Sequence, residues 1–326
     1  MAQCVATDTS NFDHPGAAID MSAMQPPRLF DRPQFALRAA RARRLQTLRP
    51  GADFLLARVA DDLDLRLAAV NRPFPVAIDL FTPEAQACDA LARSGRRVFH
   101  AGPVWGDFGP TGSFVADPDR LPLADASLDL VVSLLALQWH EDWPGLFAQV
   151  RRALRADGLF LACFVGGRTL HELRAAFAEA EAEIEGGASP RVIPFADLRD
   201  AGALLQRAGF ALPVADVDTL TVRYRSLFDL AADLRAMAAT NMLRERSRKP
   251  LRRTTLFRAA ELYAERFADS DGRIRATFEL VWMSGWAPHE SQQKPLAPGS
   301  AKRSLAEALG VPEGGIVKAG KTGRDA

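Results

Sequence analysis

The sequence predicts a doubly wound α/β domain with a mostly parallel, seven-stranded sheet and a helical segment in front of it. First, short apolar runs alternate with helical patterns from residue 73 onward, as βαβ units require. Second, residues 128–135 and 159–165 are almost continuously apolar, which is typical of strands covered by helices on both faces. Third, residues 142–158 have the pattern of a crossover helix between these two strands, which predicts that the strands are parallel.

The remaining elements follow from the spacing of apolar residues along the chain. The expected strands are 76–81, 97–100, 113–116, 128–135, 159–165, 214–224 and 276–286. The other expected helices are 28–49, 53–67, 169–185, 197–208, 226–239 and 251–268. In the crossover helix, Asp142 suits the N-cap, Pro144 suits the first turn, and Gly158 is expected to end the helix. The last strand is expected to complete the sheet as a reversed edge strand.

These patterns divide the chain into four parts. Residues 1–27 are expected to be a disordered arm, 28–72 an N-terminal helical segment, 73–290 the main domain and 291–326 a flexible tail. The arginine-rich helix over 28–49 either packs its apolar side on the domain or contacts a membrane surface or an acidic partner. The basic run 244–253 is either a solvated loop or a docking patch.

Composition narrows the class of protein. Hydrophobic residues make up 48% of the chain and charged residues 25%, which is ordinary for a globular protein. A formal net charge of +1 gives no indication of a nucleic-acid partner. The three cysteines are too few for a disulfide framework. The sequence shows neither a secretory signal pattern nor an apolar run long enough to span a membrane, so a cytoplasmic protein is expected, with peripheral membrane contact left open.

Polar residues follow the first and third predicted strands, at the edge where ligands bind in open α/β sheets. Asp79 lies at the end of the first strand, and Phe81-Thr82-Pro83 stands where glycines would let backbone amides approach a cofactor. Asp117 and Pro118 follow the third strand directly. A carboxylate at this position can accept a hydrogen bond from an adenine amino group, and an ordinary turn aspartate is the equally favoured alternative.

Particular segments carry a resemblance to known proteins. Residues 121–133, LPLADASLDLVVS, are similar to the central segment of type-11 class I methyltransferases, which use S-adenosylmethionine (SAM). More narrowly, the chain resembles a family of complex I assembly factors that hydroxylate an arginine on a quinone-site subunit of respiratory NADH dehydrogenase. This narrower resemblance covers roughly residues 29–303 and rests on 30–32, 137–139, 166–174, 185–190, 200–210 and 285–295.

The resemblance implies a Rossmann-like fold, SAM as cofactor, and a protein partner that is a complex I subunit. The residues that it implies at the SAM site are Asp79, Phe81, Asp117, Pro118, Ser133, Leu134 and Leu135. The chain departs from the family pattern in three places. Phe81 and Pro83 replace glycines after the first strand, His100 ends the second strand without the acid that would bind the ribose, and Arg168 replaces another acid.

Trp139 and His140 are the candidate catalytic residues, because they lie just past the fourth strand beside two acids, a setting suited to acid–base work. The alternative interpretation is a polar entry to the crossover helix. No set of His, Cys, Asp and Glu has a recognised metal-ligand spacing, so no metal site is expected. Two functions remain: a SAM-dependent enzyme that modifies a protein side chain, or a non-catalytic assembly factor that has lost its cofactor grip.

Overall fold

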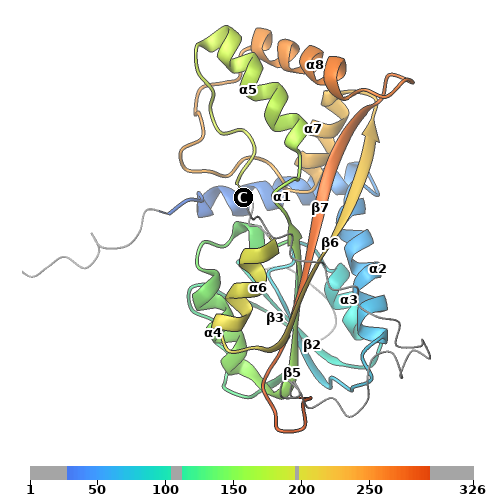
Figure 1. Cartoon of the computed structure of the whole chain (residues 1–326), viewed down its shortest axis with the longest axis vertical. Coiled ribbons are helices and arrows are strands. Elements are labelled where there is room, and N and C mark those ends of the chain that lie inside the picture. Colours follow the sequence, from blue (N-terminus) through green and yellow to red (C-terminus); the bar gives the residue numbers. More distant parts are fainter. Residues whose placement is uncertain (1–27, 104–111, 195–197, 294–326) are drawn as a thin grey trace, which may run out of the picture. The chain divides into compact units, whose positions relative to one another are not determined.

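The computed structural model describes residues 28–103, 112–194 and 198–293. They contain a seven-stranded sheet with the order β3-β2-β1-β4-β5-β7-β6 (Figure 1). The strands are β1 (Val76–Leu80), β2 (Arg97–Gly102), β3 (Ser113–Val115), β4 (Leu128–Leu134), β5 (Leu154–Val165), β6 (Ala211–Tyr224) and β7 (Ile274–Trp286). Strands β1 to β5 pair in parallel, and β7 is antiparallel to its neighbours β5 and β6. The predicted doubly wound, mostly parallel sheet is confirmed.

The position of the reversed strand was predicted wrongly. The last strand, β7, lies between β5 and β6 rather than at the edge. The physical reason is visible in the burial patterns, because β7 is buried along most of its length, whereas β6 exposes many of its side chains. The more apolar strand therefore takes the interior place, and β6 forms the edge of the sheet.

The helices agree with the predicted ones to within a few residues, except that the crossover helix ends at Ala153, and Gly158, which was expected to end it, lies inside β5. They are α1 (Arg32–Leu48), α2 (Phe54–Ala68), α3 (Gln86–Ala92), α4 (Trp143–Ala153), α5 (His171–Glu185), α6 (Leu198–Arg207), α7 (Leu227–Ala236) and α8 (Arg253–Phe267). The Asp142 carboxylate caps α4 as predicted, accepting the Gly145 N–H at 2.8 Å. The short helix α3 was not predicted, because no capping side chain marks its start. Strand β5 begins earlier than predicted, since Leu154 already pairs with Leu128.

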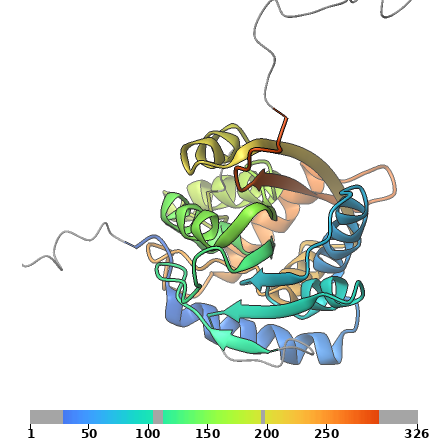
Figure 2. The same ribbon diagram turned by 90° about the horizontal axis from the view of Figure 1, so that it is seen from below.

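Helices cover both faces of the sheet (Figures 1 and 2). On one face α4 and α6 enclose a core that includes Val131, Phe147 and Leu205. On the other face α2 and α3 pack on β1 and β4, and α5, α7 and α8 continue this layer around β6 and β7. The carboxyl ends of the central strands thus face segments that come before β1 or after β5 in the sequence.

Helix α1 is attached to the chain that follows α7. The N–H of Asp31 donates to the Met242 carbonyl at 2.9 Å, and Phe30 is buried with Ile193, Met242 and Leu243. This packing supports the interpretation of residues 28–49 as a helix held on the domain. No helix among the described residues is long and apolar enough to cross a membrane. The expected arm, 1–27, and most of the expected tail lie outside the described residues.

Candidate functional site

A cavity of about 360 Å³ lies at the carboxyl ends of β1, β4 and β5, where ligands bind in this class of sheet. The strand ends contribute Phe81, Leu135 and Val165 to its wall. Helix α1 contributes Ala39 among others, and residues 237–241 line it after α7. The lining is mostly apolar, and the volume falls within the usual range of small-molecule pockets.

Asp79 is the centre of a buried hydrogen-bond network, here called the Asp79 network, that includes Thr82, Cys88 and His100. Its carboxylate Oδ2 lies 2.9 Å from Nδ1 of His100 and accepts a hydrogen bond from Sγ of Cys88 at 3.7 Å. The Thr82 hydroxyl donates to Oδ1 of Asp79. All four residues are buried, and Asp79 is opposite His100 in the β1–β2 register. The Asp79 carboxylate therefore accepts its hydrogen bonds from buried side chains of the same domain.

The turn after β1 keeps a glycine-like backbone without a glycine. Phe81 has a φ of 66°, in the left-handed region that L residues rarely adopt, and it is only 2% exposed. Its N–H donates to the Ala101 carbonyl at 2.8 Å. The Thr82 hydroxyl also accepts the Leu134 N–H at 3.0 Å. Since Pro83 has no N–H, the groups that would contact a cofactor at this turn are engaged within the protein or missing.

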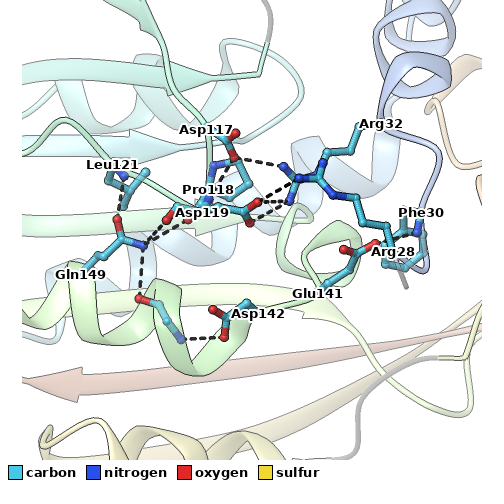
Figure 3. Close-up of polar contacts among 11 residues, drawn as sticks. Arg28, Phe30, Arg32, Asp117, Pro118, Asp119, Leu121, Glu141, Asp142 and Gln149 are labelled. Atoms are coloured by element: carbon cyan, nitrogen blue, oxygen red, sulfur yellow. Dashed lines mark hydrogen bonds and ion pairs between the residues drawn. The ribbon is translucent and has the colours of Figure 1, made fainter. Parts of the chain in front are cut away.

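Asp117 is paired with an arginine of the N-terminal helix. Nη1 of Arg32 lies 3.1 Å from Oδ1 of Asp117, and Nη2 of Arg32 lies 2.7 Å from Oδ1 of Asp119 (Figure 3). Arg28 lies 3.6 Å from the same Asp119 carboxylate, and these four residues are here called the Arg32 cluster. The hydrogen bond from Arg32 lowers the pKa of Asp119 below its ordinary value. The Asp117 side chain is 57% exposed, so it faces solvent and Arg32.

The two candidate catalytic residues lie in different surroundings. Trp139 lines the main cavity, with its ring edge-on to those of Phe30 and Phe35. Part of His140 reaches the surface, but its Nε2 is shielded from water and has no hydrogen-bond partner among the described residues. Its ring lies 4.7 Å from that of Phe81 and borders a second cavity of about 80 Å³.

The protonation state of His140 limits its chemistry. Desolvation, aided by the Arg32 charge, lowers the pKa of His140 to about 4. The imidazole is therefore neutral near pH 7 and can exchange a hydrogen bond with a ligand, but it is a poor proton donor there. Its neighbour Glu141 accepts the Phe30 N–H at 2.7 Å and so holds the N-terminal segment in place (Figure 3).

The predicted cofactor residues are divided between the cavities and the core. Of the three at the end of β4, Leu135 lines the main cavity, whereas Ser133 and Leu134 are buried in the strand. Phe81 lines both cavities and Pro118 lines the smaller one. Among the described residues, the lining of neither cavity includes Asp79 or Asp117. Arg168 is also outside both linings, and its N–H binds the Glu279 carboxylate at 2.7 Å.

Two acids that line the main cavity, Glu84 and Asp53, were not predicted as site residues. Oε1 of Glu84 lies 3.4 Å from Nε of Arg43 on α1, and the Glu84 side chain is 22% exposed. Burial raises the pKa of Glu84, and the Arg43 charge opposes this effect. The sequence did indicate Glu84 as a site residue, because it directly follows Pro83 in the turn that replaces the glycines. A half-buried carboxylate against apolar walls is suited to a guanidinium or ammonium group.

The described residues do not fit SAM in the usual way. SAM presents an adenine amino group, a ribose diol and a charged methionine portion, and each needs a hydrogen-bonding partner. Asp117 is paired with Arg32, and β2 ends in Ala101-Gly102-Pro103, which offers no carboxylate to a ribose. The buried Phe81 ring occupies the turn where backbone would approach the methionine portion. Among the described residues, the usual contacts to this cofactor are therefore either missing or, at Asp117, engaged by Arg32.

The fold and the position of the cavity define a class I methyltransferase-like protein. A family model described as "Methyltransferase domain" matches residues 77–162. The "Arginine-hydroxylase NDUFAF5, mitochondrial" of Danio rerio is 34% identical over 263 residues, covering 78% of this chain and 82% of that protein. The Homo sapiens protein of the same name is 36% identical over 263 residues, covering 78% of this chain and 76% of its own length. The chain belongs to the family of these arginine hydroxylases.

A relative with a different printed activity matches a shorter stretch of the chain. The "Malonyl-[acyl-carrier protein] O-methyltransferase" of Xylella fastidiosa (strain M23) is 40% identical over 184 residues, covering 55% of this chain and 58% of that protein. Among solved structures, the YcgJ protein of Bacillus subtilis covers 70% of this chain and 98% of its own at 13% identity. The TM-score of this match is 0.48.

Proposed function

We propose that this chain modifies an arginine side chain of a protein, as an enzyme acting in the assembly of respiratory complex I. The proposal is supported by the match to the arginine hydroxylases, which extends over 263 residues and so reaches well beyond the methyltransferase model at 77–162. The partner would be a complex I subunit, and a cytoplasmic location is part of the same proposal. The relatives themselves are named as mitochondrial proteins.

The observation that carries this proposal is the half-buried Glu84 carboxylate in the wall of a mostly apolar cavity. Arg43 already places a guanidinium nitrogen 3.4 Å from this carboxylate, so the surroundings of Glu84 accept such a group. The Arg43 side chain is 34% exposed and can turn toward solvent when a substrate arginine takes its place. The methylene groups of that arginine would then pack on the apolar walls, as long cationic side chains commonly do.

A non-catalytic assembly factor is the second candidate, and the altered turn after β1 favours it. If two or three hydrogen bonds to SAM are lost, at about 1 kcal/mol each, the affinity falls on the order of a hundredfold. SAM is the cofactor of the first candidate, and replacement contacts would have to come from polar groups such as Gln138 and Thr169 in the cavity wall.

The proposal is tested in a host whose own gene for this chain is deleted, by restoring the wild type or Glu84→Gln. Mass spectrometry of the complex I subunits then measures arginines that carry an added oxygen atom or methyl group. Wild type should restore the modification, and Glu84→Gln should lower it at least about tenfold, because a charge-assisted hydrogen bond to the substrate is lost. Glu265→Gln is the matched control, since this side chain is 61% exposed on α8.

The outcomes separate the two candidates. If the wild type restores complex I without any modified arginine, the chain is an assembly factor and the enzymatic proposal is wrong. If Glu84→Gln and wild type gave equal modification, Glu84 would not bind the substrate arginine. Calorimetric titration of the purified protein with SAM tests the cofactor separately, and absence of binding at millimolar SAM would exclude it.

A further inference from the structure

The Asp79 network contains three side chains of the kinds that bind transition metals. Asp79 lies on β1, Cys88 on α3 and His100 on β2, and all three are buried. Their ligand atoms lie within 4.8 Å of one another, although the residues are up to 21 positions apart in the sequence. The parallel register places Asp79 opposite His100, and α3 brings Cys88 back over the same two strands.

The distances between these atoms are close to those around one tetrahedral ion. Zinc binds carboxylate oxygen, imidazole nitrogen and thiolate sulfur at about 2.0 to 2.3 Å, so neighbouring ligand atoms are about 3.3 to 3.6 Å apart. Oδ2 of Asp79 lies 2.9 Å from Nδ1 of His100 and 3.7 Å from Sγ of Cys88. The third pair, Nδ1 of His100 and Sγ of Cys88, lies within 4.8 Å, so these two side chains need to approach each other by at most about 1.2 Å to share one ion.

We propose that Asp79, Cys88 and His100 bind a divalent transition-metal ion, with its fourth position directed toward the main cavity. Thiolate, imidazole and carboxylate together favour zinc, ferrous iron or cobalt over magnesium or calcium, which prefer oxygen ligands alone. Thr82 and His100 both line the cavity, so water or a substrate group can reach this side of the network. The Cys88 proton, now shared with Asp79 through a hydrogen bond, leaves to solvent when the metal–sulfur bond forms.

This site is independent of the proposed function, because it uses none of the residues assigned to substrate binding. Glu84 lies in the wall of the same cavity, so an ion bound here would face the space that the proposed substrate enters. Three protein ligands with an open fourth position are the usual arrangement of a catalytic metal rather than a structural one.

The test uses the full chain, treated with a chelator and then titrated with cobalt(II) as the probe. One equivalent should bind and produce both tetrahedral d–d absorption and a thiolate-to-cobalt charge-transfer band. Cys88→Ala should abolish the charge-transfer band and weaken cobalt binding more than about a hundredfold, since it removes a direct ligand. Cys163→Ala is the matched control, because Cys163 is also a buried cysteine but belongs to β5.

If Cys88→Ala does not fold, X-ray absorption of the wild-type cobalt protein gives the same answer through sulfur in the coordination shell. The proposal is overturned if folded wild type binds no cobalt, if the bound ion has no sulfur ligand, or if folded Cys88→Ala keeps the charge-transfer band. In those cases Cys88 and His100 serve only as hydrogen-bond partners of Asp79. No substrate or SAM enters the experiment, so its failure would be distinct from a failure of the proposed function.

Discussion

The Asp79 network and the Arg32 cluster contain the two carboxylates that the resemblance assigns to SAM, yet their physical surroundings are opposite. Asp79 is 0% exposed and takes hydrogen bonds from Thr82, Cys88 and His100. The side chain of Asp117 is 57% exposed and is paired with Arg32, which comes from a helix outside the sheet. Asp79 is held in the core by buried hydrogen bonds, and Asp117 is held at the surface by an ion pair.

This difference indicates which of the two carboxylates can still bind a ligand at the carboxyl ends of the strands. An exposed ion pair contributes about 1 kcal/mol or less, so Asp117 can exchange Arg32 for a ligand at small cost. Asp79 can turn to a new partner only if it leaves several buried donors unpaired, which costs far more. Binding to a nucleoside is therefore more compatible with Asp117, which follows β3, than with Asp79 on β1.

Replacing Asp79 should have the largest effect. Asp79→Ala removes the buried carboxylate that accepts from the Thr82 hydroxyl and pairs with the His100 imidazole, so we expect a loss of about 4 kcal/mol in the free energy of unfolding. Chemical denaturation of chelator-treated protein measures this loss without any contribution from a bound ion. Asp125→Ala is the control, since its side chain is 73% exposed and its pair with Arg152 contributes about 1 kcal/mol or less. Equal losses for the two variants would contradict the comparison.

All the strands and every helix except the short α3 could be predicted, because each depends on local apolar spacing. The Asp142 cap is equally local, and it was predicted correctly. The place of β7 was not, because it depends on which of two late strands is more apolar along its whole length. Strand order is a property of the folded sheet, and spacing along the chain does not encode it directly.

The candidate site depended on contacts that the sequence could not indicate. Arg32 reaches Asp117 across 85 positions, and Arg43 reaches Glu84 from another part of the same helix. Such pairs follow from where α1 crosses the strand ends, and this crossing is determined by packing after α7. The proximity of Asp79 and His100 was accessible in principle, because adjacent parallel strands place equivalent ends side by side.

A smaller effect is expected at the turn after β1, where Phe81 directly precedes Thr82 of the Asp79 network and its ring lies 4.7 Å from that of His140. Phe81→Gly and Phe81→Ala both remove the buried ring, but only glycine adopts a φ of 66° without strain. We therefore expect Phe81→Gly to be more stable than Phe81→Ala by about 1 kcal/mol, although a glycine variant is usually less stable than the alanine variant. Thermal or chemical denaturation of both variants measures the difference.

The matched pair is Phe147→Gly and Phe147→Ala, since Phe147 is also buried but lies in the regular helix α4. There the glycine variant should be the less stable by about 1 kcal/mol, because glycine is a poor helix residue. The same order at both positions would show that the turn after β1 relaxes when the ring is removed. The backbone after β1 would then be able to change its conformation rather than being fixed by the surrounding structure.

The smallest effect concerns His140, which lies between β4 and α4. Its pKa is lowered to about 4 from an ordinary value of 6.5, so the unfolded chain binds more protons than the folded chain between these values. Stability is therefore full above pH 6.5 and falls as the pH drops toward 4. Between pH ~7.5 and ~6 we expect a loss of about 0.5 kcal/mol, reduced from the fully buried case because part of the residue is exposed. His140→Gln should lack this loss, which denaturation at both pH values would measure. If wild type and His140→Gln had the same pH dependence, the imidazole would be solvated, and the smaller cavity would then hold water rather than present an unpaired nitrogen to a ligand.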